Sequence, residues 1–292
     1  MRRRAFLLAS LVAAALGAAA HTAYADVPTA STAVAKTVDD VLARNAKARG
    51  GVDAWHRVER MVWLGHVEPA VERDDTPKPK FVMHLQKPNL IRFEVKTKHS
   101  DYTRIFDGSH GWSTHPAKDG RPTVTSFSKA DIDFAKAEFV IDGPLLDAKT
   151  KGVRVSLDGI DTVDGQKAYR LSLKLPNGAE RKVWIDLKTN LEVRYDRPAG
   201  SGADPNRPVQ TYYRDWSAEE GVMVAHTIET SSVPGESSIE MPLRDRVIIE
   251  RVLINPTLDA ETFAMPAAPM RRNKKTEVHI DNGTPGLTEL SR

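Results

Sequence analysis

From residue 61 onward the chain alternates apolar and polar positions, the pattern of strands that bury one face. The clearest segment is Ile91–Lys96, where isoleucine, phenylalanine and valine alternate with charged residues. Phe81, Met83 and Leu85 have the same parity on the preceding segment. Further alternating segments are Met61–Gly65, Tyr169–Leu175, Val183–Leu187, Leu191–Tyr195, Thr211–Trp216, Val222–Ser231 and Val247–Ile254.

Short turns connect several of these segments. Asp164-Gly165, Asn177-Gly178 and Lys188-Thr189-Asn190 are typical of hairpins. About ten strands joined in this way predict an antiparallel sheet with one apolar face. Because only two or three helices are available to cover that face, we expect the sheet to curl. Its interior is then either filled by side chains or open to an apolar ligand.

Three segments have helical character. Thr37 is a candidate N-cap for a helix that ends at Gly50-Gly51, and a short second helix is expected to contain Trp55 and Val58. Lys129–Phe139 has helical composition. The apolar segment that follows, up to Leu146, contains Gly-Pro and cannot be a regular strand. The predicted class is therefore mainly β (α+β).

The first 25 residues have the layout of a secretory signal peptide. Arg2, Arg3 and Arg4 precede the apolar run Ala5–Ala20, and Ala23-Tyr24-Ala25 is a typical cleavage site. The run is short and rich in alanine for a membrane span. The motif around Arg3 and Arg4 also fits twin-arginine export, so the Sec and twin-arginine routes both stay open. No later stretch is apolar enough to anchor the chain, which predicts a soluble periplasmic protein cleaved after Ala25.

Charge is balanced in the remaining chain. Lys and Arg total 42, and 42 less the three arginines of the signal leaves 39, which equals the 39 Asp and Glu. This balance argues against a nucleic-acid partner. The absence of cysteine excludes disulfides and thiolate chemistry. We expect a flexible leader over 26–36, a single domain over 37–266, an irregular tail over 267–292, and a monomer.

Motifs for catalysis are missing. The chain has no Gly-x-Ser-x-Gly elbow, no P-loop and no His-Glu-x-x-His, and its histidines are scattered. His110 and His115 lie in a predicted turn without converging partners. The sequence therefore predicts no catalytic residue, no metal site, no cofactor and no enzyme.

Four short motifs resemble the periplasmic lipoprotein-carrier (LolA-like) superfamily. They are Gln86–Glu94, the Asp-Gly hairpin and Trp of Phe106–Trp112, and Leu258–Phe263 near the end. The fourth, Ala48–Trp55, is similar to the branch named "outer membrane lipoprotein-sorting protein"-like chains. The resemblance implies a half-open antiparallel barrel closed by helices, which shields acyl chains as they cross the periplasm. Each buried methylene contributes ~0.8 kcal/mol, so an acyl chain gains much from such a cavity.

The parity of the strands and this resemblance give a set of candidate lipid-binding residues. Lys87 stands where the family has arginine before the Pro-Asn-Leu turn, and a lysine cannot make the planar fork of hydrogen bonds that an arginine makes. For Lys87 the alternative is a side chain that extends into water. For Ile91, Phe93 and Trp112 the alternative is ordinary packing. The predicted lipid-binding residues are Met83, Leu85, Lys87, Ile91, Phe93, Val95 and Trp112.

These patterns favour a periplasmic carrier that binds lipid or lipoprotein acyl chains in a hydrophobic cavity. The alternative is a lipid-sensing regulator or scaffold of the same fold that binds an inner-membrane or outer-membrane protein. An enzyme is a third class, which no arrangement of residues in the sequence supports.

Overall fold

The computed structural model describes residues 34–35, 37–68, 78–96, 101–116, 122–138, 140–198, 208–232 and 245–265. Within these ranges there are three helices: α1 (Val38–Ala48), α2 (Val52–His56) and α3 (Lys129–Glu138). The first six strands are β1 (Arg60–Glu68), β2 (Lys80–Gln86), β3 (Leu90–Lys96), β4 (Asp101–Phe106), β5 (Gly111–Pro116) and β6 (Pro122–Ser126). The others are β7 (Arg154–Val163), β8 (Gln166–Lys174), β9 (Glu180–Asp186), β10 (Glu192–Pro198), β11 (Pro208–Glu219), β12 (Val222–Ser232) and β13 (Asp245–Ile254).

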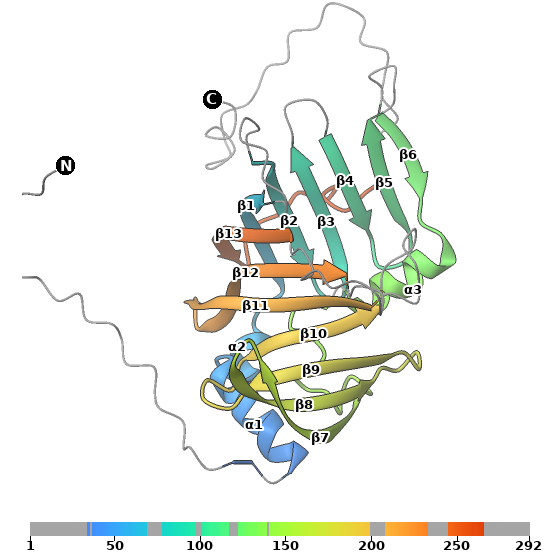
Figure 1. Cartoon of the computed structure of the whole chain (residues 1–292). Coiled ribbons are helices and arrows are strands. Elements are labelled where there is room, and N and C mark those ends of the chain that lie inside the picture. Colours follow the sequence, from blue (N-terminus) through green and yellow to red (C-terminus); the bar gives the residue numbers. More distant parts are fainter. Residues whose placement is uncertain are drawn as a thin grey trace, which may run out of the picture.

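All of these strands belong to one antiparallel sheet. Its order is β6-β5-β4-β3-β2-β1-β13-β12-β11-β10-β9-β8-β7, so the sheet consists of two meanders joined where β1 pairs with β13. The sheet curves strongly, and β6 and β7 stay at its two edges instead of closing a barrel (Figure 1). This confirms the predicted mainly β class with a curved, half-open antiparallel sheet.

The helices form close to where the sequence predicts them, with one correction: α2 ends at His56, so Val58 lies after the helix and packs in the core. Thr37 caps α1, because its Oγ1 accepts a hydrogen bond from the Asp40 backbone N–H at 3.1 Å. The helix ends before Gly50, which has a φ of 103°. A Cβ atom at Gly50 would lie 2.2 Å from the backbone oxygen of Gly221, so only glycine lets the end of α1 approach the β11–β12 hairpin. Figure 1 shows α1 beside β7 and α3 close to the end of β6.

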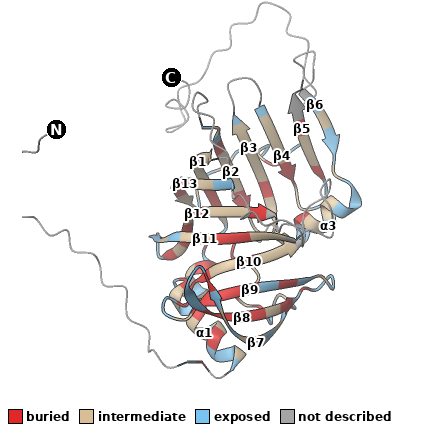
Figure 2. Ribbon diagram, viewed as in Figure 1, coloured by how far each residue is buried: buried red, intermediate tan, exposed pale blue. Residues whose placement is uncertain are grey.

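Buried apolar side chains form two main groups. Figure 2 shows buried segments in strands of both halves of the sheet. The first core combines α2 and the irregular segment around Ile141 with the strands of the first meander and with β12 and β13. The second core packs α1 and the turns around Leu145 and Ala148 against β8 and β9. In the second core Leu171, Leu173 and Ile185 are at most 1% exposed, so this end of the sheet is densely filled.

Three strands exceed the roughly ten that the alternation predicted. β5 and β6 extend the sheet beyond the Asp-Gly hairpin at Gly108, and β6 is almost entirely polar, so it carries no alternating signal. β7 alternates weakly around its bulge near Gly159. The predicted helix at 129–139 is confirmed as α3 over Lys129–Glu138, while Phe139 lies outside the described residues. The segment from Ile141 to Leu146 forms turns and no regular strand, as the Gly-Pro pair predicted.

Several predicted segments lie outside the described residues. These are the signal peptide over 1–25, most of the leader over 26–36, the loop between Pro198 and Pro208, and the tail over 267–292. Among the helices that the structure does describe, none combines the length and apolar content that crossing a bilayer requires.

Candidate functional site

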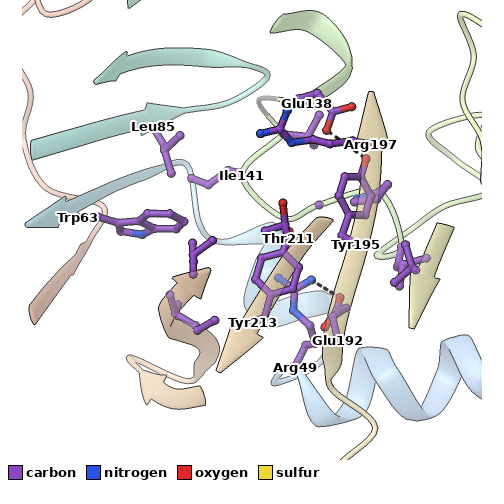
Figure 3. A pocket seen from close by; sticks show the side chains of 18 of the residues that line it. Arg49, Trp63, Leu85, Glu138, Ile141, Glu192, Tyr195, Arg197, Thr211 and Tyr213 are labelled. Atoms are coloured by element: carbon purple, nitrogen blue, oxygen red, sulfur yellow. Dashed lines mark hydrogen bonds and ion pairs between the residues drawn. The ribbon is translucent and has the colours of Figure 1, made fainter. Parts of the chain in front are cut away.

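A cavity of about 360 Å³ lies on the concave side of the sheet, between the first meander and strands β10–β12 (Figure 3). Its volume falls in the range of small-molecule sites, roughly 300–1,000 Å³. The interior of the curved sheet is therefore only partly filled by side chains. The residues that line the cavity are Arg49, Trp55, Trp63, Met83, Leu85, Ile91, Phe134, Ala137, Glu138, Val140, Ile141, Gly143, Pro144, Leu145, Val183, Glu192, Tyr195, Arg197, Thr211, Tyr213, Trp216, Met223, Val224, Ala225, Ile228 and Thr230.

One wall of the cavity is apolar. Trp63 of β1, Met83 and Leu85 of β2, and Ile91 of β3 all face it, because alternate residues of paired strands share a face of the sheet. The indole N–H of Trp63 is directed to Sδ of Met61 at 3.0 Å, which leaves its ring available as apolar surface. Ile228 of β12 adds to the same lining. This wall offers contact area without directional groups, which suits a hydrocarbon chain.

The opposite wall is polar and contains a buried ion pair. Arg49, which follows α1, contacts Glu192 of β10 at 3.0 Å, and the two side chains are 8% and 10% exposed. The Arg49 guanidinium lies 4.5 Å from the ring centroid of Trp55 and also donates to the backbone oxygen of Asp142 at 3.2 Å. Trp216 donates to the backbone oxygen of Glu192 at 3.1 Å. A buried pair held by this many contacts is fixed in geometry and strongly destabilising to break.

A second carboxylate in this wall is fully paired. Glu138, at the end of α3, accepts from Arg181 at 2.7 Å through Oε1 and from the Tyr195 hydroxyl at 3.1 Å through Oε2. Burial raises the pKa of Tyr195, and the adjacent Glu138 carboxylate raises it further, so Tyr195 stays a neutral donor. This cluster ties α3 to strands β9 and β10.

Glu192 and its neighbours are less completely paired. Its Oε2 and the Oγ1 of Thr211 on β11 are buried atoms without a hydrogen-bond partner, and so is Nε of Arg49. An unpaired buried polar group costs roughly 1–3 kcal/mol, so native proteins rarely leave one without a purpose. Burial, with Glu192 as a second cause, raises the pKa of Tyr213 above its usual value, so this phenol also stays protonated.

A second cavity, of about 520 Å³, lies beside the first. The two share Ala137, Val140, Gly143 and Pro144 in their linings, so the segment between α3 and the following turns separates them. The second cavity has a charged rim. There Lys151 contacts Asp142 at 2.7 Å and His56 contacts Asp147. Burial lowers the pKa of Lys151, although its hydrogen bond to Asp142 opposes that shift.

The predicted lipid-binding residues fall into four places. Met83, Leu85 and Ile91 line the first cavity, whereas Lys87 lines the second, where its Nζ donates to the backbone oxygens of Trp55 and His56 at 3.0 and 3.3 Å. Lys87 thus joins the β2–β3 turn to α2. The other three predicted residues, Phe93, Val95 and Trp112, line neither cavity.

Phe93 and Val95 lie further along the concave face. Phe93 pairs with Met83 across β2 and β3, and its ring centroid is 5.8 Å from that of Phe81. Trp112 lies on the other face of the sheet, because its register partner Ile105 pairs with Arg92, the neighbour of Ile91 and Phe93. For all seven residues, a contact with lipid stays a prediction.

Sequence reasoning missed the polar wall. Arg49 was part of a motif, but nothing in the spacing of Glu192, Tyr195, Thr211 and Tyr213 marks them as neighbours of Arg49. They come together only because β10 and β11 pair and α1 packs against their strand ends. In the part of the chain that the structure describes, no three His, Asp or Glu side chains gather as metal ligands.

Comparisons with known proteins return structural likenesses only. No family model and no curated protein sequence matches the chain. Among solved structures, a LolA superfamily protein from Nitrosomonas europaea covers 79% of this chain and 99% of its own, with 11% identity and a TM-score of 0.49. A DUF1329 family protein from Desulfovibrio piger covers 80% and 100%, with 13% identity and a TM-score of 0.49.

A third structure, the lipoprotein LppX from Mycobacterium tuberculosis, covers 56% of this chain and 91% of its own, with 14% identity and a TM-score of 0.26. One of these structures, the protein from Nitrosomonas europaea, belongs to the superfamily that the sequence motifs resemble. At these low identities and TM-scores the likenesses say nothing about activity.

Proposed function

We propose that the protein is a non-catalytic carrier, exported to the periplasm, that binds an acyl chain of a lipid or lipoprotein in the cavity of about 360 Å³. The observation that carries the proposal is the apolar wall of Trp63, Met83, Leu85 and Ile91, which borders open space on the concave side of the sheet. Well-packed interiors contain few voids larger than a water molecule, so a cavity of this size needs an occupant.

The energetics support a hydrocarbon occupant. Each methylene moved from water to this wall contributes ~0.8 kcal/mol, and a long chain makes many such contacts before ordering costs are subtracted. In an aqueous compartment a free acyl chain has no apolar surface of this kind to contact. Flexible side chains such as Met83 adapt to a chain that has no fixed shape.

The test is to purify the protein from the cell envelope, extract it with solvent and identify bound lipids by mass spectrometry. The delipidated protein is then titrated with a fluorescent fatty-acyl probe. We expect saturable binding that unlabelled hexadecanoyl lipid displaces. Extraction that yields no lipid, together with no saturable binding, would refute the carrier.

A matched pair of variants assigns that binding to the cavity. Ile228→Trp replaces an aliphatic side chain of the cavity lining with a larger indole that fills part of the cavity. It should weaken probe binding at least about tenfold, or ~1.4 kcal/mol. Ile160→Trp makes the same change at a β7 position that is 45% exposed, so its affinity should match the unmodified protein. If both variants bind equally well, the probe sits elsewhere. The regulator alternative would then be favoured by stoichiometric capture of one membrane protein.

A further inference from the structure

The polar wall of the cavity contains two buried oxygen atoms that lack a hydrogen-bond partner. They are Oε2 of Glu192 and Oγ1 of Thr211, in residues that are 7% and 6% exposed. Nε of Arg49, which belongs to the same wall, is also unpartnered. Figure 3 shows Arg49, Glu192 and Thr211 on the side of the cavity that faces Trp63 and Leu85. All three residues line the cavity, so a bound group can lie beside them.

The nearby carboxylate of Glu138 shows that the wall can satisfy its own polar atoms. Both of its oxygens have partners, one in Arg181 and one in Tyr195. Glu192 accepts a hydrogen bond from Arg49 through Oε1 only, although its side chain is about as deeply buried as that of Glu138. Incomplete pairing is therefore a local property of the Glu192 side of the wall, and not of every carboxylate that lines the cavity.

The charges restrict which group fits there. Arg49 and Glu192 already form a neutral pair, so a charged group placed beside them has no counterion there. Arg197, another cation of the lining, lies near Glu138 instead (Figure 3). A carboxylate head would also face the free oxygen of Glu192, and like charges at such short range repel. An ester has no donor and leaves that oxygen unpaired. A neutral group that both donates and accepts can give its hydrogen to Glu192 and accept from Thr211 or Arg49.

We propose that the cavity selects an amphiphile whose polar group is a neutral hydrogen-bond donor, an alcohol or an amide, held at Glu192 and Thr211. This inference rests on the proposed function, since the apolar wall holds the chain of the same molecule. The polar group lies against β10 and β11, and the chain extends toward Trp63, Leu85 and Ile91.

The experiment compares three competitors that share one chain: dodecanol, dodecanoate and methyl dodecanoate. Each displaces the fluorescent acyl probe from the delipidated protein at neutral pH. Dodecanol should compete at a concentration about tenfold lower than either of the others, because a hydrogen bond to a charged acceptor strengthens binding by at least that factor. Dodecanamide should behave like dodecanol.

Two variants locate the preference. Glu192→Gln replaces the acceptor with an amide that can donate, so the advantage of dodecanol over the methyl ester should fall to about twofold or less. Thr211→Val removes only an unpartnered hydroxyl and should fold normally while it reduces the advantage by about threefold. Thr230→Val is the matched control. It lines the cavity opposite Thr211 in the β11–β12 register, and its hydroxyl is not among the unpartnered buried atoms.

Each outcome decides between the two proposals. If the three competitors displace the probe equally, water completes the free atoms, and the selectivity is refuted while the carrier stands. If dodecanoate binds most tightly, the polar group sits elsewhere, and the selectivity is again refuted. If no competitor displaces the probe and none binds, the carrier itself fails. An alcohol preference that Thr230→Val abolishes as fully as Thr211→Val does would also overturn the assignment.

Discussion

The two ends of the concave face are built from the same alternating strands but are filled differently. Beneath β8 and β9, side chains such as Leu171 and Ile185 are fully buried against α1 and the turns that follow α3. Beneath β1–β3, Trp63 and Met83 stay partly exposed around the cavity. Both regions have apolar residues at every second position, so hydrophobic pattern alone does not decide whether a sheet encloses a core or a cavity.

What differs is the element that covers each region. α1 places Val41 directly into the β8–β9 core, whereas the cavity is bordered by the irregular segment around Ile141 and by polar side chains. Arg49 follows α1, which packs into the second core, and it stacks on Trp55 of the first core, so the Arg49–Glu192 pair lies between the two regions. Apolar side chains packed directly onto this ion pair would bury its polar atoms without offering hydrogen bonds, which is costly. The polar wall therefore helps to keep the space beside the pair open.

The largest effect is expected where the two regions meet. Arg49→Met removes the charge partner of Glu192 and should lower the free energy of unfolding by about 3–5 kcal/mol, because the carboxylate stays buried and unpaired. Urea denaturation followed by circular dichroism measures the loss. The double variant Arg49→Met with Glu192→Leu should recover most of it. A single variant that loses less than about 1 kcal/mol would show that Glu192 reaches solvent or another partner.

The same leucine-to-alanine change should lower the free energy of unfolding more in the densely packed region than in the region beside the cavity. Leu171→Ala, in the dense core, should cost about 4 kcal/mol, whereas Leu85→Ala, beside the cavity, should cost about 2 kcal/mol. Leu85 already faces empty space on one side, so it has fewer contacts to lose. Denaturation of both variants in parallel provides the measurement. Equal losses would contradict the contrast between the two regions.

The binding assay gives the same pair a second readout. Leu85→Ala should alter acyl-probe affinity because it changes the cavity wall, and Leu171→Ala should leave the affinity of the folded fraction unchanged. An affinity change in Leu171→Ala alone would place the binding site in the second core instead.

The sequence predicted those parts of the fold that depend on local pattern. The alternation of Ile91–Lys96, the cap at Thr37 and the stop at Gly50 each correspond to an element in the structure. The polar strand β6 was missed, because Pro122–Ser126 has almost no apolar residues to alternate and is held by its pairing with β5.

The candidate site was only half predictable, for a related reason. The alternation of residues along two strands is enough to place Met83, Leu85 and Ile91 on one face, and these residues line the cavity. The pairing of Arg49 with Glu192 spans 143 positions and depends on how α1 docks against β10. No periodicity encodes such a contact, so the polar half of the site needed three-dimensional information.

The smallest predicted effect concerns how far the binding surface extends beyond the cavity. Phe93 shares the face of Met83 but does not line the cavity, so only a chain long enough to leave the cavity can contact it. Phe93→Ala should therefore weaken binding of a hexadecanoyl chain about threefold, because a few methylenes lose apolar cover, and leave an octanoyl chain unchanged. Trp112→Ala, on the opposite face, should affect neither chain. An equal loss for both chain lengths would mean that Phe93 acts by supporting the cavity wall. No loss for either would confine the site to the cavity, and weaker binding in Trp112→Ala would move part of the ligand to the other side of the sheet.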